Sequence, residues 1–509
     1  MENNNSMSAS RRVFYRFGLS ATIILAVVSI VVLVLVGRFG ADRPVEYRDD
    51  IEHFKYGSLG SEHEFGIPYW IWRALPELFK DKLPGDRSGW QSVGFVFEKG
   101  KQLPVGMSQR RYLGFDVVWL NCAFCHAGTV RETPQSEPKV YAAMPANTFD
   151  FRGFMRFLFA TGEDRRFTPQ DILRQIDIIR KREGLGKTPL LDRLVLRFYA
   201  IYYMRERLLT LRDRLEFIKQ QPEWGPGRVD TFNPLKVYFS FPPEQLSPQE
   251  IIGTTDFPSI WNQGQRESLK MNLHWDGNNV SLEERNRSAA MGTGITPPTG
   301  DRRSLQRVAD WLRKLDAPPY PFKIDKNLAG QGAPIYKNYC AGCHGADGKD
   351  FRGEFVGKVV PITEIATDTR RLDSYTYDVA VNQNLIFAGY GDERFSHFRK
   401  TFGYANSPLD GLWLRSPYLH NGSVPTLRDL LEPSDKRPKT FYRGYDVYDQ
   451  KKVGFVSEVA AEQGKKYFLY DTDESKQPGN SNKGHEGKGY GTELTPAEKD
   501  ALVEYLKTF

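Results

Sequence analysis

The chain has little cysteine and no dense block of positive charge. Its 509 residues include four cysteines, which form two Cys-x-x-Cys pairs with none left over, and this argues against structural disulfides. The net charge is +7, but the lysines and arginines are dispersed, so no nucleic-acid-binding footprint is present. Hydrophobic residues make up 40% and charged residues 26%, which is typical of a globular protein. A chain of this length is expected to build more than one core.

A histidine follows each cysteine pair directly. The two motifs are Cys122-Ala123-Phe124-Cys125-His126 and Cys340-Ala341-Gly342-Cys343-His344. This pattern attaches haem c, because the two thiols add to the porphyrin vinyl groups and the histidine reaches the iron. A zinc ribbon brings its two pairs within about 15–20 residues, whereas 218 positions separate Cys122 from Cys340, and a thioredoxin-like redox pair does not need both histidines. We therefore predict two covalently bound haem c groups with His126 and His344 as iron ligands. Calcium is a cofactor that the sequence leaves open.

The N-terminal region contains one long uncharged apolar run. Phe17 to Gly37 is 21 residues without a charge, enough for a helix to cross a hydrocarbon core of about 30 Å. Three arginines precede the run and only Arg38 follows it closely, which favours a cytoplasmic N-terminus. A cleaved signal peptide is the alternative, but Val36-Gly37-Arg38-Phe39 offers no small-x-small cleavage site. We predict a single-pass anchor at 17–37 in a bacterial inner membrane, with residues 1–16 in the cytoplasm and the rest in the periplasm.

Two stretches of the chain repeat the same order of motifs. After the first Cys-x-x-Cys-His come Thr255–Trp261, then Trp275-Asp276-Gly277 and a helical segment at 308–315; after the second come Leu412–Pro417, His420-Asn421-Gly422 and a helical segment at 502–509. Prolines at 318, 319 and 321 interrupt any helix between the two stretches. The sequence thus predicts a mainly α protein with two cytochrome c-type domains in tandem after the transmembrane helix, at 38–320 and 321–509. A Leu/Ile/Arg-rich stretch at about 165–225 is a helical insertion in the first domain.

The sixth iron ligands are less clear than the fifth. All eight methionines precede residue 300, so the second haem is expected to take a histidine, with His397, His420 and His485 as candidates. We predict His485, because its glycine-rich loop can fold closely over a macrocycle. His420 stands at the place that Trp275 has in the other repeat, which suggests a structural role. For the first haem, a methionine, His274 and an open position all remain.

At these residues the chain resembles the bacterial dihaem cytochrome c peroxidase superfamily, most closely the branch that contains the dihaem rubber oxygenase. The most similar segments are 66–72 (Gly-Ile-Pro-Tyr-Trp-Ile-Trp), Asn121–His126, His274–Gly277, Tyr418–Leu427 and Gly484-His485. The resemblance implies that Trp275 relays electrons between the haems. It also implies a C-terminal histidine, here His485, that closes the second haem, and an open first haem in an aromatic pocket, for which Trp261 and Trp275 are the nearest equivalents.

One departure from the family affects the expected reaction. Peroxidases of this superfamily carry a glutamate about twenty residues beyond the tryptophan, whereas this chain has Gly294-Ile295-Thr296-Pro297-Pro298-Thr299 there. General acid–base catalysis typically contributes about 10²–10⁴-fold. Glu283 and Glu284 are nearby but are expected at a helix start. We predict a dihaem oxidoreductase that reduces peroxide at the first haem, with a dioxygen-activating oxygenase or a pure electron carrier as alternatives. The expected partner is a small donor protein, a cytochrome or cupredoxin, attracted by the weakly basic surface.

Overall fold

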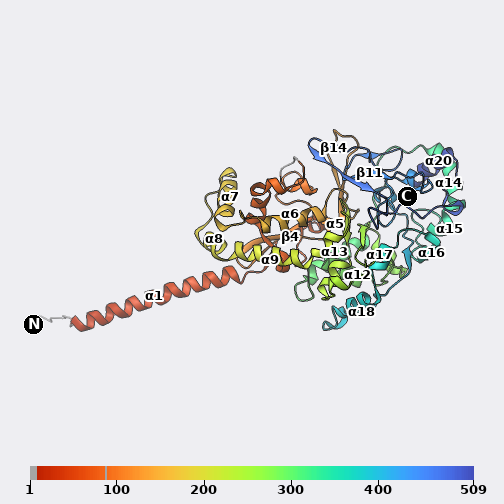
Figure 1. Cartoon of the computed structure of the whole chain (residues 1–509). Coiled ribbons are helices and arrows are strands. Elements are labelled where there is room, and N and C mark those ends of the chain that lie inside the picture. The colour runs from red at the N-terminus through yellow and green to blue at the C-terminus, as the bar shows by residue number, and fades with distance from the viewer. Residues whose placement is uncertain (1–8, 86–88) are drawn as a thin grey trace, which may run out of the picture.

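The computed structural model describes residues 9–85 and 89–509 as a rounded body from which one long helix, α1 (Ala9–Phe39), projects (Figure 1). Within α1, Leu19–Phe39 has a mean hydropathy of 3.1 and none of it is buried. It is long and apolar enough to cross a membrane, a criterion that signal sequences also meet. The mainly helical fold with an N-terminal apolar helix is thus confirmed, and the tandem arrangement of two domains stays a prediction. Residues 1–8 of the predicted cytoplasmic segment lie outside the described residues.

Nine of the helices α2 to α20 begin at a side chain that caps them. Asp150, Thr168 and Ser281, for example, each accept a hydrogen bond from a backbone N–H of the following first turn. The capping box expected at Thr495 and Glu498 is present at the start of the last helix. The helices of six or more residues are α2 (Asp50–Tyr56), α4 (Tyr69–Leu78), α6 (Phe151–Glu163), α7 (Pro169–Arg182), α8 (Leu190–Val195), α9 (Ile201–Arg214), α10 (Asn233–Tyr238), α11 (Gln263–Ser268), α12 (Leu282–Met291), α13 (Arg302–Lys314), α14 (Lys326–Tyr339), α18 (Tyr377–Leu385) and α20 (Pro496–Leu506). The shorter ones are α3 (Glu62–Phe65), α5 (Ala123–His126), α15 (Ala341–His344), α16 (Ile362–Ile365), α17 (Arg370–Ser374), α19 (Leu427–Leu430) and the π-helical turn η3 (Leu196–Ala200).

The strands are short, and a four-stranded antiparallel sheet is the largest unit they form. Its order is β1-β3-β4-β2, with Met107 opposite Leu120 and Tyr112 opposite Phe115. The sheet strands are β1 (Arg43–Pro44), β2 (Ile67–Pro68), β3 (Met107–Tyr112) and β4 (Phe115–Leu120). The other strands pair in twos: β5 (Ala127–Val130) with β6 (Lys139–Ala142), β7 (Arg228–Asp230) with β8 (Thr254–Asp256), β9 (Val359–Pro361) with β10 (Gly403–Ala405), β11 (Thr440–Arg443) with β16 (Phe468–Asp471), β12 (Tyr448–Asp449) with β13 (Gly454–Phe455) and β14 (Ala461–Glu462) with β15 (Lys465–Lys466).

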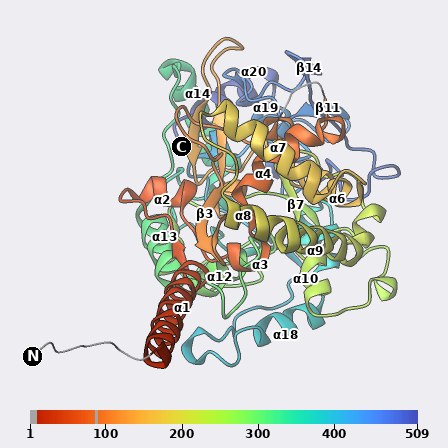
Figure 2. The same ribbon diagram turned by 90° about the vertical axis from the view of Figure 1, so that its left-hand side faces the viewer.

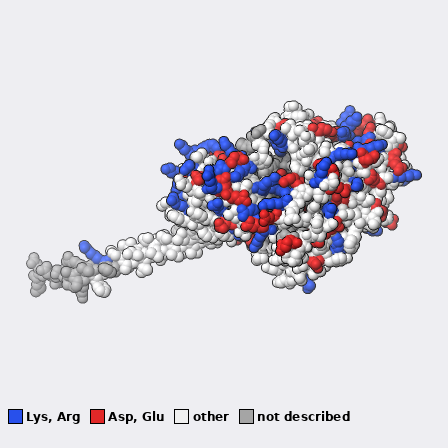
Figure 3. Space-filling view, in the orientation of Figure 1, with Lys and Arg blue, Asp and Glu red and all other residues white. Residues whose placement is uncertain are grey.

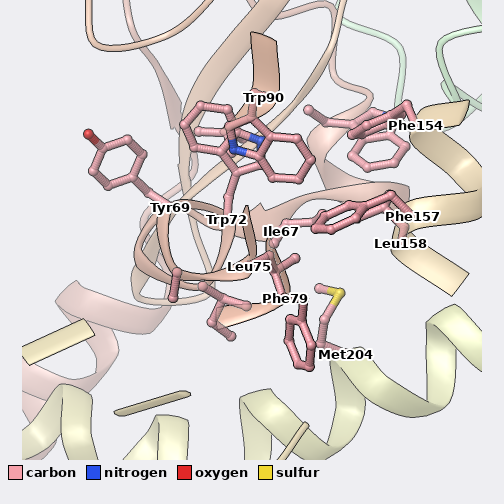
Figure 4. Close-up of a cluster of buried hydrophobic side chains, with 14 of the residues drawn as sticks. Ile67, Tyr69, Trp72, Leu75, Phe79, Trp90, Phe154, Phe157, Leu158 and Met204 are labelled. Atoms are coloured by element: carbon pink, nitrogen blue, oxygen red, sulfur yellow. The ribbon is translucent and has the colours of Figure 1, made fainter. Parts of the chain in front are cut away.

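The sheet packs against α4, α6, α7 and α9 through a large aromatic core (Figure 4). Trp72 and Trp90 stack with their ring centres 5.3 Å apart at its centre. A fully buried tryptophan removes about 150–250 Å² from water, which stabilises the fold by about 4–6 kcal/mol. The same core reaches Met204 and Leu208 on α9. The 165–225 stretch is therefore part of the body, because α7, η3 and α9 share this core.

The two repeated motifs fold into the same turn. Isolated antiparallel bridges join Leu273 to Asn279 and Tyr418 to Val424. In both turns the residue after the bridge has a φ of +66° and the glycine of the Asp/Asn-Gly pair has a φ of +64°, a conformation that favours glycine. Trp275 and His420 thus occupy equivalent positions. The two turns meet at Asp256, whose carbonyl oxygen accepts from Trp275 Nε1 at 2.8 Å and whose N–H donates to the His420 carbonyl at 2.9 Å.

Candidate functional site

The first Cys-x-x-Cys-His motif leaves the end of β4 and forms α5. The Asn121 amide before it donates to the carbonyls of Lys55 and Gly57, and its oxygen accepts from Ala123 N–H, which fixes the start of the motif. His126 Nδ1 donates to the Pro258 carbonyl at 2.9 Å, so Nε2 is the nitrogen left for a metal. Burial lowers the pKa of His126 to about 3, which keeps the imidazole neutral near pH 7. The residues therefore fit an iron-bound haem c.

A large cavity opens beside this motif. Its volume is about 1730 Å³, against about 300–1,000 Å³ for pockets that enclose a drug-sized ligand. Cys122, Cys125 and His126 line it on one side. Much of the remaining wall is apolar and comes from the sheet and from α6 and α9: Trp119, Phe151, Met155, Leu158, Phe159, Met204 and Leu208. The cavity has room for an attached macrocycle and a further molecule.

The two predicted catalytic tryptophans lie in different places. Trp275 lines the cavity. Trp261 is fully buried, is absent from the cavity wall, and donates from Nε1 to the Asp410 carbonyl at 3.0 Å. The Arg415 guanidinium lies over its ring at 5.9 Å from the centre. The placement of Trp261 gives no support to its predicted role in the pocket, because the hydrogen bond to Asp410 holds it in the packing between distant parts of the chain.

In the described part of the chain, the ring that contacts His126 is that of Phe257, 6.4 Å away, and not a second imidazole. His274 lines the same cavity, but its Nδ1 lies 2.6 Å from Asn278 Oδ1 and its nearest ring partner is Phe398, at 6.4 Å. Burial lowers the pKa of His274 to about 4. Three methionines, Met155, Met204 and Met291, also line the cavity. A methionine, His274 and an open position thus remain the candidates for the first haem.

The second motif has a histidine facing it. His344 ends α15, and its ring centre lies 6.3 Å from that of His485. Metal–nitrogen bonds of about 2 Å and a ring radius of roughly 1.2 Å put the centres of two imidazoles on one metal ion about 6 Å apart. Burial lowers the pKa of His344 to about 4 and of His485 to about 3, so both are neutral near pH 7. This pair fits a haem iron closed on both sides.

The other two candidate histidines have different partners. His420 Nε2 lies 3.0 Å from the Tyr404 hydroxyl, and the two rings stack with their centres 4.0 Å apart. His397 is half-exposed and its Nδ1 lies 2.7 Å from Glu284 Oε1. His420 therefore has a structural role in this arrangement, and His397 pairs with Glu284 at the start of α12.

Arg437 holds the loop that carries His485, a role that sequence reasoning missed. Its buried guanidinium donates to the carbonyl oxygens of Gly484 at 2.9 Å and His485 at 3.2 Å, and also to those of Asn482, Leu430 and Glu432. Gly484 has a φ of +85°, and a Cβ there would lie 2.5 Å from Thr367 N. The loop conformation thus needs both the arginine and the glycine. Nothing local in the sequence marks Arg437 as different from other arginines.

Arg285 is a second residue that the sequence did not single out. It lies on α12, is 8% exposed and lines the cavity together with Cys122 and His126. Its one side-chain hydrogen bond goes to Asn286, and no carboxylate lies within ion-pair distance of it among residues 9–85 and 89–509. Burial lowers the pKa of its guanidinium to about 10. A buried cation needs an anionic partner, and a haem c bound at Cys122 and Cys125 would bring propionate carboxylates into this cavity.

Residues 403–442 match the family described as RoxA-like, cytochrome c-like. This segment is similar to a RoxA-like cytochrome c domain. The resemblance found in the sequence is thereby confirmed, and a cytochrome c-like family implies covalently bound haem c with its iron. The matched segment includes β10, Tyr404 and the turn that carries His420. The family match supports a haem oxidoreductase, and it leaves the number of haems and the reaction open.

Two proteins similar to this chain come from Sinorhizobium fredii (strain NBRC 101917 / NGR234). The uncharacterized protein y4iM is 31% identical over 297 residues, which cover 50% of this chain and 64% of y4iM. The uncharacterized protein y4iJ is 32% identical over 243 residues, which cover 36% of this chain and 39% of y4iJ. The chain thus spans less than two thirds of either relative. A solved structure, Kuenenia stuttgartiensis hydrazine synthase pressurized with 20 bar xenon, is 16% identical, with a TM-score of 0.24 over 50% of this chain and 73% of that one, too low to support an argument about fold.

Proposed function

We propose that this chain is a membrane-anchored, periplasmic dihaem cytochrome c that oxidises an apolar substrate at its first haem. The first haem is held by Cys122, Cys125 and His126, and the second by Cys340, Cys343, His344 and His485. The observation that carries the proposal is the asymmetry between the two sites. His344 faces His485 across the width of one iron, whereas His126 faces a cavity of about 1730 Å³. The second site suits electron transfer, and the first suits chemistry.

The size and lining of the cavity favour oxygenation over peroxide reduction. A haem iron with an exchangeable position activates dioxygen or peroxide. Peroxide itself needs little space, whereas Trp119, Phe151 and Phe159 line a much larger volume with apolar surface. Such a wall excludes water and binds an apolar molecule. We therefore place dioxygen activation ahead of the peroxide reduction that the sequence favoured.

Peroxide reduction is the second candidate, because the cavity contains a carboxylate that the sequence did not reveal. Glu64 lies on α3 and lines the cavity, and its Oε1 accepts from Thr296 Oγ1 at 3.2 Å. Thr296 belongs to the segment in which the family's glutamate is missing. Glu64 therefore lies beside that segment although it comes from a distant part of the chain. This position supports a proton-transfer role for its carboxylate.

Contacts between Trp275 and the second haem motif support electron transfer between the haems. The Trp275 carbonyl accepts from Ala405 N–H of β10 at 2.7 Å. The next residue, Asn406, donates from its amide to the Cys343 carbonyl. Two hydrogen bonds, joined through Ala405 and Asn406, therefore link Trp275 at the cavity to Cys343 of the second motif. The electrons would come from a small cytochrome or cupredoxin.

Spectroscopy of the purified full chain tests the proposal. The denatured polypeptide should retain two haems by mass spectrometry, and the ferric protein should show one low-spin iron and one iron that binds cyanide. Rapid mixing of the reduced protein with dioxygen should change the spectrum of the cyanide-binding haem. If neither dioxygen nor peroxide perturbs it and cyanide does not bind, the chain is an electron carrier. A periplasm-dependent reporter fused after Phe509 should be active, and cytoplasmic activity would reverse the orientation.

A further inference from the structure

An exposed apolar stripe runs along α8, η3 and the start of α9. Leu190, Leu194, Phe198 and Tyr202 recur at every fourth residue and are 75%, 45%, 69% and 56% exposed. Tyr199 beside them is also exposed. We name these five side chains the α8–α9 face. Contiguous exposed apolar surface on a protein body marks an interaction site.

The α8–α9 face lies next to the end of α1. Arg38, the last basic residue of α1, forms an ion pair with Asp192 of α8 and donates to the Gly114 carbonyl at 3.1 Å. Leu113, at the tip of the β3–β4 hairpin beside this contact, is exposed as well. In Figure 1, α8 lies at the end of the body from which α1 departs, and Figure 2 shows α7, α8 and α9 spread across that end. A bilayer crossed by α1 would therefore face this end of the body.

We propose that the α8–α9 face rests on the phospholipid bilayer that α1 spans. Apolar and aromatic side chains on a surface helix enter the boundary between headgroups and acyl chains, where tyrosine is favoured. Basic residues precede the face along the chain: Arg180, Lys181 and Arg182 end α7, and Lys187 follows them. Figure 3 shows Lys and Arg side chains on this end of the body. They suit an anionic lipid surface, which attracts such residues near it.

The same helix connects the α8–α9 face to the cavity. Tyr203 stacks on Tyr199 with ring centres 5.5 Å apart, is 44% exposed and also lines the cavity. Arg207, one turn further along α9, lines the cavity and donates to the Tyr203 hydroxyl at 2.9 Å. The cavity thus reaches the membrane side of the body at Tyr203. If the first motif carries out the proposed oxidation, the position of Tyr203 implies that the substrate is an apolar molecule dissolved in the lipid. This step rests on the proposed function.

Photo-crosslinking of the full chain tests the contact. The protein is reconstituted in phosphatidylethanolamine/phosphatidylglycerol vesicles that contain a phospholipid with a photoreactive acyl chain, and adducts are mapped by mass spectrometry. Adducts are expected on α1 and on residues 190–203. The triple variant Leu190→Ser/Phe198→Ser/Tyr202→Ser should reduce the adducts on 190–203 by about tenfold or more. The matched control is Tyr377→Ser/Val381→Ser/Leu385→Ser, which removes three exposed apolar side chains from α18, away from α8 in Figure 1, and should change nothing.

The outcomes separate this inference from the proposed function. Adducts on α1 without adducts on 190–203 in the unmodified protein would overturn the contact and leave the anchor and the haem chemistry intact. An absence of adducts on both would overturn the anchor as well. The unmodified protein decides the matter even if the triple variant does not fold, and the haem absorption spectrum of each variant reports its folding.

Discussion

Replacing Arg437 with methionine should release the second haem from His485 without touching either histidine. The buried guanidinium donates to five backbone carbonyls, two of which belong to Gly484 and His485. Methionine is of similar length and apolar, so Arg437→Met removes the donors and leaves the carbonyls buried. The loop that carries His485 then loses the contacts that hold it opposite His344.

The free-energy cost of Arg437→Met to the loop conformation follows from the number of backbone carbonyls that it leaves without a donor. A buried acceptor without a partner costs about 1–3 kcal/mol. Counting only the carbonyls of Gly484 and His485, the loop conformation loses about 2–6 kcal/mol. Because about 1.4 kcal/mol is a tenfold change in an equilibrium constant, the balance between ligated and displaced His485 shifts by about thirtyfold or more. A measurable fraction of the second haem should therefore become high-spin.

Low-temperature EPR of the ferric protein measures this fraction. His485→Ala, the full loss of the ligand, defines complete conversion of one low-spin signal. Arg428→Met is the matched control, because Arg428 makes part-exposed ion pairs with Glu432 and Asp500 that are worth about 0–1 kcal/mol. It should leave the spectrum unchanged. If His485→Ala loses the low-spin signal and Arg437→Met keeps all of it, the loop does not depend on Arg437 and the reasoning is refuted.

Three further changes give separate readouts. Arg285→Gln should lower the midpoint potential of the first haem at unchanged haem content, since a cation that favours the reduced state is lost; an unchanged potential would exclude Arg285 as its counter-charge. Glu64→Gln should slow peroxide turnover by about 10²–10⁴-fold if Glu64 transfers protons, whereas an equal rate would exclude that role. Burial lowers the pKa of His420 well below its ordinary value of about 6.5, so below pH 6.5 only the unfolded chain gains this proton and stability falls by up to about 1.4 kcal/mol per pH unit. His420→Asn should flatten that decline in melting temperature, and an unchanged slope would contradict it.

Local patterns predicted the parts of this molecule that depend on near neighbours. The capping box at Thr495 and the two equivalent turns at Trp275 and His420 follow from residues within a few positions of one another. The internal repeat added the equivalence of Trp275 and His420, and so pointed away from His420 as a ligand. Composition alone predicted the apolar helix at the N-terminus.

Long-range partners decided what the sequence could not show. Trp261 is held by the Asp410 carbonyl 149 positions away, so no local pattern indicates that it is absent from the cavity wall. Glu64 accepts a hydrogen bond from Thr296, 232 positions later in the chain. The segment around Thr296 lacks the glutamate that the family's peroxidases carry there, but the fold places the carboxylate of Glu64 beside it. The sequence marked His485 through its glycines, but the arginine that fixes it enters from another loop, 47 positions from Gly484. In each case, the chain topology brings together residues whose pairing no spacing rule indicates.

In the proposed function, the helical stretch at 165–225 accounts for the difference between the surroundings of the two Cys-x-x-Cys-His motifs. Its helix α9 supplies Met204 and Leu208 to the cavity beside His126, and the preceding α8 supplies the exposed apolar face beside α1. The second repeat has no such stretch, and there the loop at Gly484 folds inward and brings His485 opposite His344. In the proposed arrangement, this segment leaves space beside His126 and turns the cavity toward the membrane. A pair of similar haem-binding repeats can in this way divide between chemistry and electron transfer without any change in either Cys-x-x-Cys-His motif.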